Sequence, residues 1–220
     1  MKRTIFIGDI QWCYDEYKAL LKKLEITEND TVYLVGDMIS RGPKSYKVLK
    51  HLYKHRSQFH AVKWNHEVNF LRWLENWWDY QDNTSFIELK NKIEEKDKQK
   101  YIDYLKELPL YIETDDFIVL HAWKYPDKEL SDHDIDEITR VREINNTPWY
   151  KLYTDDKKII YWHWAVDGLR KRKNTIWLDT GCVYGKTLTA YILETDEIIQ
   201  QQALDIYHNV YEDRWDKEKK

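Results

Sequence analysis

Six polar residues that suit metal binding follow apolar segments of this sequence. They are Asp9 after residues 4–7, Asp37 after 31–35, Asn65 and His66 after 60–63, His121 after 117–120 and His163 after 158–162. In layered α/β proteins, binding sites form where strands end in loops, so the residues at five such strand ends can lie close together in one site. Two carboxylates, an amide oxygen and imidazoles suit a pair of divalent ions such as Mn²⁺, Fe²⁺ or Zn²⁺. Ions about 3.5–4 Å apart, bridged by a carboxylate, activate water for in-line attack on phosphorus.

The first third of the chain alternates between strand and helix patterns. Apolar runs predict strands at 4–9, 31–37 and about 60–63. Between them, Tyr17, Leu20, Leu21 and Leu24 recur at helical spacing within a predicted helix over 14–24, and a second helix carries an apolar face from Val48 to Tyr53. This β-α-β-α-β order favours a layered α/β architecture with adjacent strands in one sheet.

The remaining segments predict a helical insertion followed by more strands. Residues 67–108 read as helical up to Pro109, which stops the pattern. Strands are predicted at 116–122, 158–165, 175–181, 188–195 and 197–205, and the last two form a hairpin around Asp196. We expect one domain over residues 1–212, with the insertion at 67–108 and a disordered tail at 213–220.

Composition excludes several classes of partner. The net charge is −4, which does not favour a nucleic-acid polymer as partner. No apolar run approaches the length of a membrane span, and the first residues do not form a signal peptide. Two cysteines do not make a disulfide framework. We therefore expect a cytoplasmic protein without a membrane partner, and the oligomeric state stays open.

Six blocks of this sequence resemble, in order, the motifs of the calcineurin-like metallophosphoesterases. The blocks are "GDIQWCYDE", "GDMISRGPKS", "WNHE", "LHAW", "YWHWA" and "LDTGCVYGKTLTAY", which span about residues 3–195 apart from the insertion. The resemblance implies an α/β fold of layered mixed β-sheets, a β-sandwich flanked by helices. It also implies two divalent metal ions, Mn²⁺ before Fe²⁺, Co²⁺ or Zn²⁺, and a phosphoester or nucleotide substrate. The blocks look most like those of the symmetrical diadenosine tetraphosphatases, with the bacterial and phage Ser/Thr protein phosphatases next.

The resemblance also implies a role for each residue of the motifs. Asp9 would bind the first metal, Asp37 would bridge both, and Asn65, His121 and His163 would bind the second. His66 would donate a proton to the leaving oxygen, as an imidazole can near neutral pH. Arg41 would hold a phosphate oxygen through paired hydrogen bonds, and Arg140 and Arg142 are further candidates for phosphate contacts.

Two departures from the family pattern bear on the substrate. Gln11 stands where the protein phosphatases have His, and Ser40 stands where they have Asp. The diadenosine tetraphosphatase branch tolerates Gln at the first place and a small neutral residue at the second. Both residues therefore favour a dinucleoside polyphosphate substrate, with the amide oxygen of Gln11 as a weaker metal ligand than an imidazole.

Tryptophan occupies places that are glycine in the family motifs. These are Trp12, Trp64, Trp123 and Trp162, while Trp177 stands at a place that usually holds a small residue. Glycine at such turns supplies a positive φ or a close approach to phosphate, so we expect strain and crowding there.

Three functions stay open: a dinucleoside polyphosphate hydrolase, a Ser/Thr protein phosphatase, and a catalytically impaired relative with a Trp-filled site that acts as a binding or structural protein.

Overall fold

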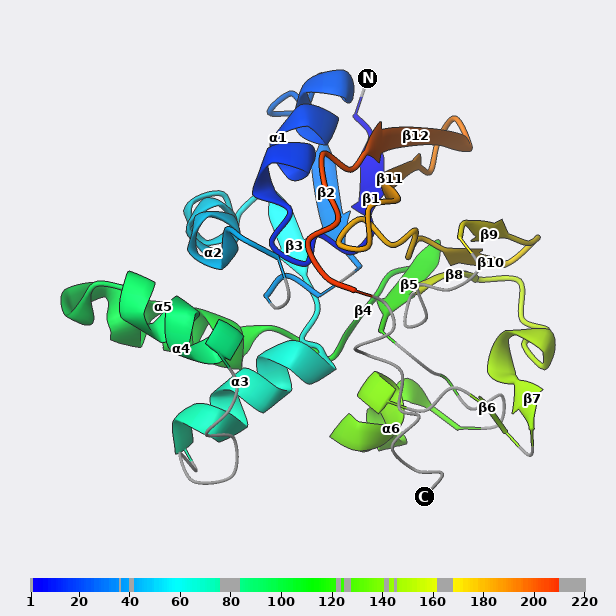
Figure 1. The fold of residues 1–220 in the computed structure, drawn as a ribbon. Coiled ribbons are helices and arrows are strands. Elements are labelled where there is room, and N and C mark those ends of the chain that lie inside the picture. Colours follow the sequence, from blue (N-terminus) through cyan, green and yellow to red (C-terminus); the bar gives the residue numbers. More distant parts are fainter. Residues whose placement is uncertain are drawn as a thin grey trace.

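The described residues form two five-stranded sheets, one two-stranded sheet and a set of helices, shown as a computed structural model in Figure 1. The structure describes residues 2–35, 37–39, 42–75, 84–121, 124, 128–140, 143–144, 146–161 and 168–209. The predicted tail at 213–220 lies outside these ranges.

The first sheet joins the two ends of the described chain. Its strands are β1 (Thr4–Ile7), β2 (Thr31–Leu34), β3 (Phe59–Ala61), β11 (Thr187–Ile192) and β12 (Glu197–Gln202), in the order β12-β11-β1-β2-β3. Strands β1, β2 and β3 run parallel, whereas β11 is antiparallel to β1. The parallel order confirms the predicted β-α-β-α-β unit, and it brings the carboxyl ends of three strands to one edge.

The second sheet is built from the latter half of the chain. Its strands are β4 (Tyr111–Glu113), β5 (Phe117–Leu120), β8 (Lys158–Tyr161), β9 (Arg170–Lys171) and β10 (Thr175–Trp177), in the order β4-β5-β8-β10-β9. Strands β5, β8 and β10 are parallel, so they too end at a common edge.

A buried aromatic and aliphatic cluster packs the two sheets against each other. Phe6 of β1 meets Phe117 of β5 edge to face, with ring centroids 4.9 Å apart. Ile160, Ile176 and Tyr191 belong to the same cluster, so strands of both sheets contribute. This packing confirms the predicted sandwich of mixed sheets, since each sheet buries one face against the other.

Helices α1 (Tyr14–Lys23) and α2 (Ser45–Lys54) belong to a second buried cluster with residues of the first sheet (Figure 1). Tyr17, Leu20 and Leu21 of α1 are buried, as the helical spacing predicts. The connections from β1 into α1 and from β2 into α2 are the loops that carry the first two acidic motif residues.

The described part of the predicted insertion contains three helices, and they extend as an arm from the sheets (Figure 1). They are α3 (Asn65–Glu75), α4 (Thr84–Lys92) and α5 (Glu95–Glu107). The expectation of one helical stretch over 67–108 is wrong at both its start and its middle. The first helix begins two residues earlier, at Asn65. Glu94 adopts an extended ψ of 138°, which separates α4 from α5.

Several short elements escaped the sequence patterns. These are β4, β9, the helix α6 (Ile135–Arg140), the two-residue strands β6 (Glu143–Ile144) and β7 (Thr147–Pro148), and 3₁₀ turns at Leu130–Asp132 and Trp149–Lys151. None of these short elements contains an apolar run of the kind that predicted the equally short strands β1 and β11. The predicted hairpin is confirmed: β11 pairs with β12, and Asp196 takes a positive φ of 57° in the turn.

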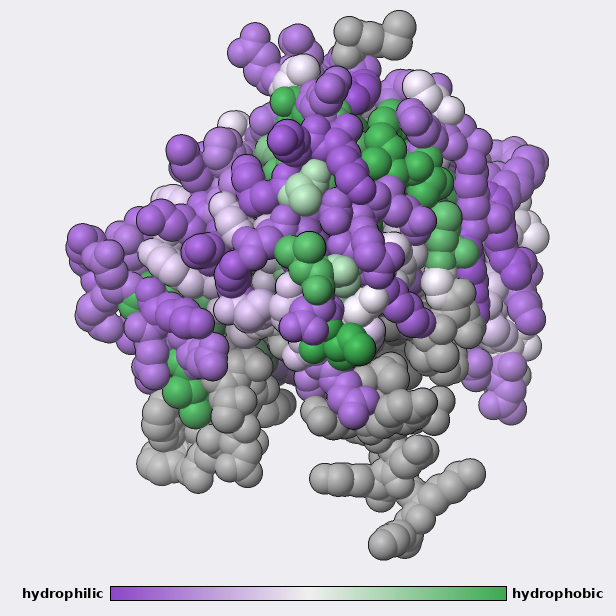
Figure 2. Space-filling view, turned by 45° about the horizontal axis from the view of Figure 1, so that its top comes forward, coloured by the Kyte–Doolittle hydropathy of each residue, from purple (hydrophilic) through white to green (hydrophobic). Residues whose placement is uncertain are grey.

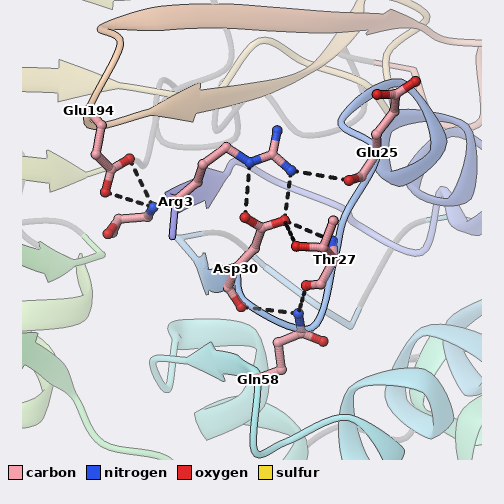
Figure 3. Close-up of polar contacts among 7 residues, drawn as sticks. Arg3, Glu25, Thr27, Asp30, Gln58 and Glu194 are labelled. Atoms are coloured by element: carbon pink, nitrogen blue, oxygen red, sulfur yellow. Dashed lines mark hydrogen bonds and ion pairs between the residues drawn. The ribbon is translucent and has the colours of Figure 1, made fainter. Parts of the chain in front are cut away.

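A polar network ties the start of β1 to the β2 entry and to the end of β11 (Figure 3). The guanidinium of Arg3 donates to both carboxylate oxygens of Asp30, at 2.9 and 2.6 Å. Asp30 also accepts hydrogen bonds from Thr27, and the backbone N–H of Thr4 donates to Glu194 at 2.9 Å. The paired guanidinium holds the pKa of the Asp30 carboxyl down to about 2.

The surface seen in Figure 2 is mostly hydrophilic, with small separate apolar groups. In the described ranges, the large hydrophobic residues that stay exposed are Leu152, Leu204 and Ile206. None of the described helices has both the length and the apolarity needed to cross a bilayer.

Candidate metal centre

Three of the predicted ligands follow the parallel strands of the first sheet. Asp9 lies two residues after β1, Asp37 three residues after β2, and Asn65 begins α3 after β3. Asp9 and Asp37 are 2% and 0% exposed. Because β1, β2 and β3 are parallel neighbours, these residues lie along one edge of the sheet.

Asp37 is the centre of the polar contacts at this edge. The side-chain Nε2 of Gln11 donates to Asp37 Oδ2 at 3.3 Å, and His66 Nε2 lies 3.3 Å from the same oxygen. The backbone N–H of Gln11 donates to the carbonyl of Asp37 at 2.8 Å, which joins the β1 loop to the β2 loop. The structure therefore brings together Gln11, Asp37 and His66, three residues chosen from separate motifs.

His121 brings the second sheet to the same place. It follows β5 directly, is fully buried, and lies against the indole of Trp64 with ring centroids 4.1 Å apart. Trp64 immediately precedes Asn65, so a ligand candidate from the second sheet lies beside one from the first.

The remaining predicted site residues lie wholly or partly outside the described part of the chain. His163, Arg41, Ser40 and Arg142 are outside it, as are Trp123 and Trp162. Arg140 is the last residue of α6, but its side chain is outside the description. Strand β8 is described from Lys158 to Tyr161, and residues 162–165 of the predicted strand lie outside the description.

The described side chains fit the donor set of a divalent metal. Within the described residues, Asn65 Oδ1 is buried and accepts no hydrogen bond, which suits an oxygen that binds an ion. Two buried carboxylates and the buried imidazole of His121 complete a mixed oxygen and nitrogen set. In the same part of the chain, no three His, Cys, Asp or Glu side chains converge closely enough to form a ready metal cluster. Such a cluster would leave out half of the six expected ligands, because Gln11 and Asn65 are amides and His163 is outside the described residues.

The β1 loop confirms the strain expected at a motif glycine position. Gln11 and Trp12 adopt positive φ angles of 37° and 64°. Trp12 is 1% exposed, and its indole Nε1 has no hydrogen-bond partner among the described residues. Gly42 packs tightly on this turn: a Cβ added there would lie 2.2 Å from the carbonyl oxygen of Gln11. The turn keeps a conformation that glycine adopts readily and tryptophan adopts at a cost.

The other described tryptophans at motif positions differ from Trp12. Trp64 has no positive φ, so the expectation of backbone strain is wrong there. What the indole of Trp64 does instead is pack against the ring of His121. Trp177 lies in β10 and packs with Tyr161, with ring centroids 5.4 Å apart. It belongs to the core cluster behind the second sheet, where a large ring fills space.

Two buried acids near the site were missed by the sequence reasoning. Glu67 is fully buried in the first turn of α3, and its Oε1 accepts the backbone N–H of Ile39 at 3.2 Å. Burial raises the pKa of Glu67 to about 7, and backbone amides facing it oppose that rise. Asp179 lies two residues after β10, is 1% exposed, and accepts the backbone N–H of Gly181 at 3.0 Å. The position of Asp179 just after an apolar strand was a signal that could have identified it.

The chain is similar to known proteins along nearly its whole length. The model of the calcineurin-like phosphoesterases matches residues 2–201. A symmetrical bis(5'-nucleosyl)-tetraphosphatase of Neisseria meningitidis is 28% identical, over 90% of this chain and 94% of its own length. The enzyme of that name from Vibrio campbellii is 26% identical, over 91% and 99%.

Solved structures agree with this similarity. A crystal structure of a candidate diadenosine tetraphosphatase superposes with a TM-score of 0.80 at 25% identity, covering 92% of this chain and 94% of that one. A Ser/Thr phosphatase structure from Saccharomyces cerevisiae reaches 0.60 at 16% identity, over 92% and 80%, and so shows the shared fold alone. With its two-sheet fold, its strand-end acids and a family match over residues 2–201, this chain belongs to the calcineurin-like phosphoesterases, a family of metal-dependent hydrolases.

Proposed function

We propose that this protein hydrolyses dinucleoside polyphosphates, such as diadenosine tetraphosphate, with two divalent ions of which Mn²⁺ is the first candidate. The convergence of Gln11 and His66 on one oxygen of buried Asp37 carries the proposal. The substrate class is supported by two relatives that are named symmetrical bis(5'-nucleosyl)-tetraphosphatase. This chain aligns with them over nearly their whole length. The net charge of −4 does not favour a nucleic-acid polymer instead.

Each protein group has a distinct proposed task. Asp9 and the amide oxygen of Gln11 would hold one ion, Asp37 would contact both, and Asn65, His121 and His163 would hold the other. The bound ions would neutralise phosphate charge and activate the attacking water. Because Gln11 Nε2 donates to Asp37, its amide oxygen is the polar atom that remains for an ion.

His66 is the proposed proton donor. Its Nε2 lies 3.3 Å from Asp37 Oδ2, so the carboxylate orients the ring beside the candidate ligands. From there His66 would protonate the leaving oxygen, which lowers the charge that the departing nucleotide must carry. Arg41, with Arg140 and Arg142, would hold phosphate oxygens and so align the substrate for attack.

Mn²⁺-dependent hydrolysis of diadenosine tetraphosphate and of p-nitrophenyl phosphate tests the proposal. We expect turnover of both that a chelator removes and added Mn²⁺ restores, and that Asp37→Asn lacks. Glu75→Gln is a matched control, because Glu75 is exposed at the far end of α3 and pairs with Lys106 at 3.1 Å. Equal activity in the wild type and in Asp37→Asn would refute the assigned site.

A catalytically impaired relative is the second candidate. The strained Trp12 and the contact of Trp64 with His121 favour it. Absence of turnover on both substrates, together with calorimetry showing no bound Mn²⁺, would support this function and exclude the first. Preferential hydrolysis of a phosphoserine peptide would support a protein phosphatase instead.

The two buried thiols, Cys13 and Cys182, form no disulfide, which agrees with the cytoplasm as the proposed location of the protein.

A further inference from the structure

The fully buried carboxylate of Glu67 connects two segments that carry candidate metal ligands. Glu67 lies in the first turn of α3, two residues after Asn65 and one after His66. Its Oε1 accepts the backbone N–H of Ile39, two residues after Asp37, at 3.2 Å. The contact spans 28 residues of sequence and joins the β2 loop to the beginning of α3.

The surroundings of Glu67 leave it little freedom. The backbone amides of Met38 and Trp64 also face its carboxyl group, one from each segment. Residues flanking both Asp37 and Asn65 thus point N–H groups at a single side chain. The hydrogen bond from Ile39 is the contact that fixes the side chain, and a hydrogen bond to a charged group contributes about 1.5–3 kcal/mol.

The helical arm reaches the same side chain. Tyr104 of α5 is 7% exposed, and burial together with the nearby Glu67 charge raises the pKa of its phenol. The carboxyl of Glu67 therefore joins the β2 loop to the start of α3, and its charge acts on a phenol of the arm.

We propose that Glu67 is a positioning residue that fixes the separation of Asp37 from Asn65, and thereby the affinity of the ion that these two residues share. This inference rests on the proposed function, since it assigns Glu67 to the same site. Glu67 contacts neither substrate nor ion in this proposal. It acts through the backbone of the two segments that do.

Two conservative variants separate the reach of Glu67 from its charge. Glu67→Gln keeps an oxygen at the same distance for the Ile39 N–H but removes the charge. Glu67→Asp keeps the charge but is shorter by one methylene, about 1.5 Å, which takes the oxygen out of hydrogen-bond range. We expect Glu67→Gln to bind Mn²⁺ within about threefold of the wild type, and Glu67→Asp to bind about tenfold more weakly, as the loss of one charged hydrogen bond predicts.

The measurement is Mn²⁺ calorimetry, at a temperature where circular dichroism shows every variant folded, with the Mn²⁺ dependence of p-nitrophenyl phosphate hydrolysis alongside. Glu75→Gln is the control and should bind as the wild type does. A role in stability alone would lower the melting temperature of Glu67→Asp and leave its Mn²⁺ affinity unchanged, which would overturn the proposal. The reverse order, with Glu67→Gln weak and Glu67→Asp normal, would also overturn it.

Calorimetry also separates this inference from the function above. A wild type that binds Mn²⁺ but does not cleave diadenosine tetraphosphate would refute the substrate and leave the Glu67 comparison intact. A wild type that binds no Mn²⁺ would refute both.

Discussion

Replacing Trp12 should affect stability far less than replacing other buried tryptophans. Removing a buried Trp side chain typically costs about 3–5 kcal/mol. At position 12 two unfavourable features of the native tryptophan offset part of this loss, because the substitution removes both. A non-glycine residue at a φ of 64° carries about 1–3 kcal/mol of backbone strain. A buried indole N–H without a partner among the described residues adds about 1–3 kcal/mol.

The terms at position 12 nearly cancel, so Trp12→Gly should change the free energy of unfolding by less than about 2 kcal/mol. Trp73 is the matched control, because it is equally buried but lies inside α3. There the lost packing combines with the helix cost of glycine, so Trp73→Gly should lose more than about 4 kcal/mol.

Alanine variants isolate the backbone contribution. Glycine in a helix costs about 1 kcal/mol relative to alanine, so Trp73→Ala should be the more stable variant of that pair. At position 12 the order should reverse, because alanine keeps the strained φ and glycine does not. Equilibrium urea unfolding of the four variants measures this difference. Trp12→Ala as stable as Trp12→Gly, or more stable, would refute the argument from φ.

Two further predictions concern His121 and the acid response. Trp64→Gly removes the ring that packs at 4.1 Å against His121 and should raise kcat/KM on the order of tenfold in Mn²⁺-supported phosphatase assays; unchanged or lower values would show that the indole does not hinder the site. Asp30 has its pKa lowered to about 2 by the Arg3 hydrogen bonds and by Thr27, from an ordinary value of 3.8, so its stabilising effect is complete above about pH 4 and lost as the pH falls through 2. Between those pH values the wild type should lose about 2 kcal/mol more of unfolding free energy than Asp30→Asn in urea titrations, and parallel losses would contradict the role given to the pair.

The sequence predicted the parts of the fold that depend on repeated local patterns. Apolar runs of four or more residues located β1, β2, β5, β8 and β11, and the acids after β1 and β2 marked the edge where Asp9 and Asp37 lie. Strands of two or three residues, such as β9, have too few side chains to show alternation. The break at Glu94 depends on one ψ angle within a segment of good helix formers, so composition alone did not locate it.

The site shows the same division. Residue type and position selected Asp37 and His66, and the family resemblance added Gln11, but their meeting at one oxygen depends on how three loops pack. Glu67 was missed because its partners are backbone amides, and any residue type at position 39 other than proline presents the same N–H. A positive φ or a close approach to phosphate was expected at the motif tryptophans. Among those described, a positive φ occurs at Trp12, where Gly42 packs on the turn, and not at Trp64.

The turn at Trp12 has a consequence for the gene itself. Tryptophan and glycine codons are neighbours, and UGA is read as tryptophan in some genetic codes and as glycine in others. Trp12 adopts a glycine-like φ, whereas Trp73 and Trp149 fill core positions that suit an indole. UGA at positions 12, 64, 123 and 162, with UGG at 73 and 149, would mean that the cell of origin places glycine at these four motif positions. Expression in a host that inserts tryptophan would then yield a different protein, so the codons decide which chain belongs in every assay described above.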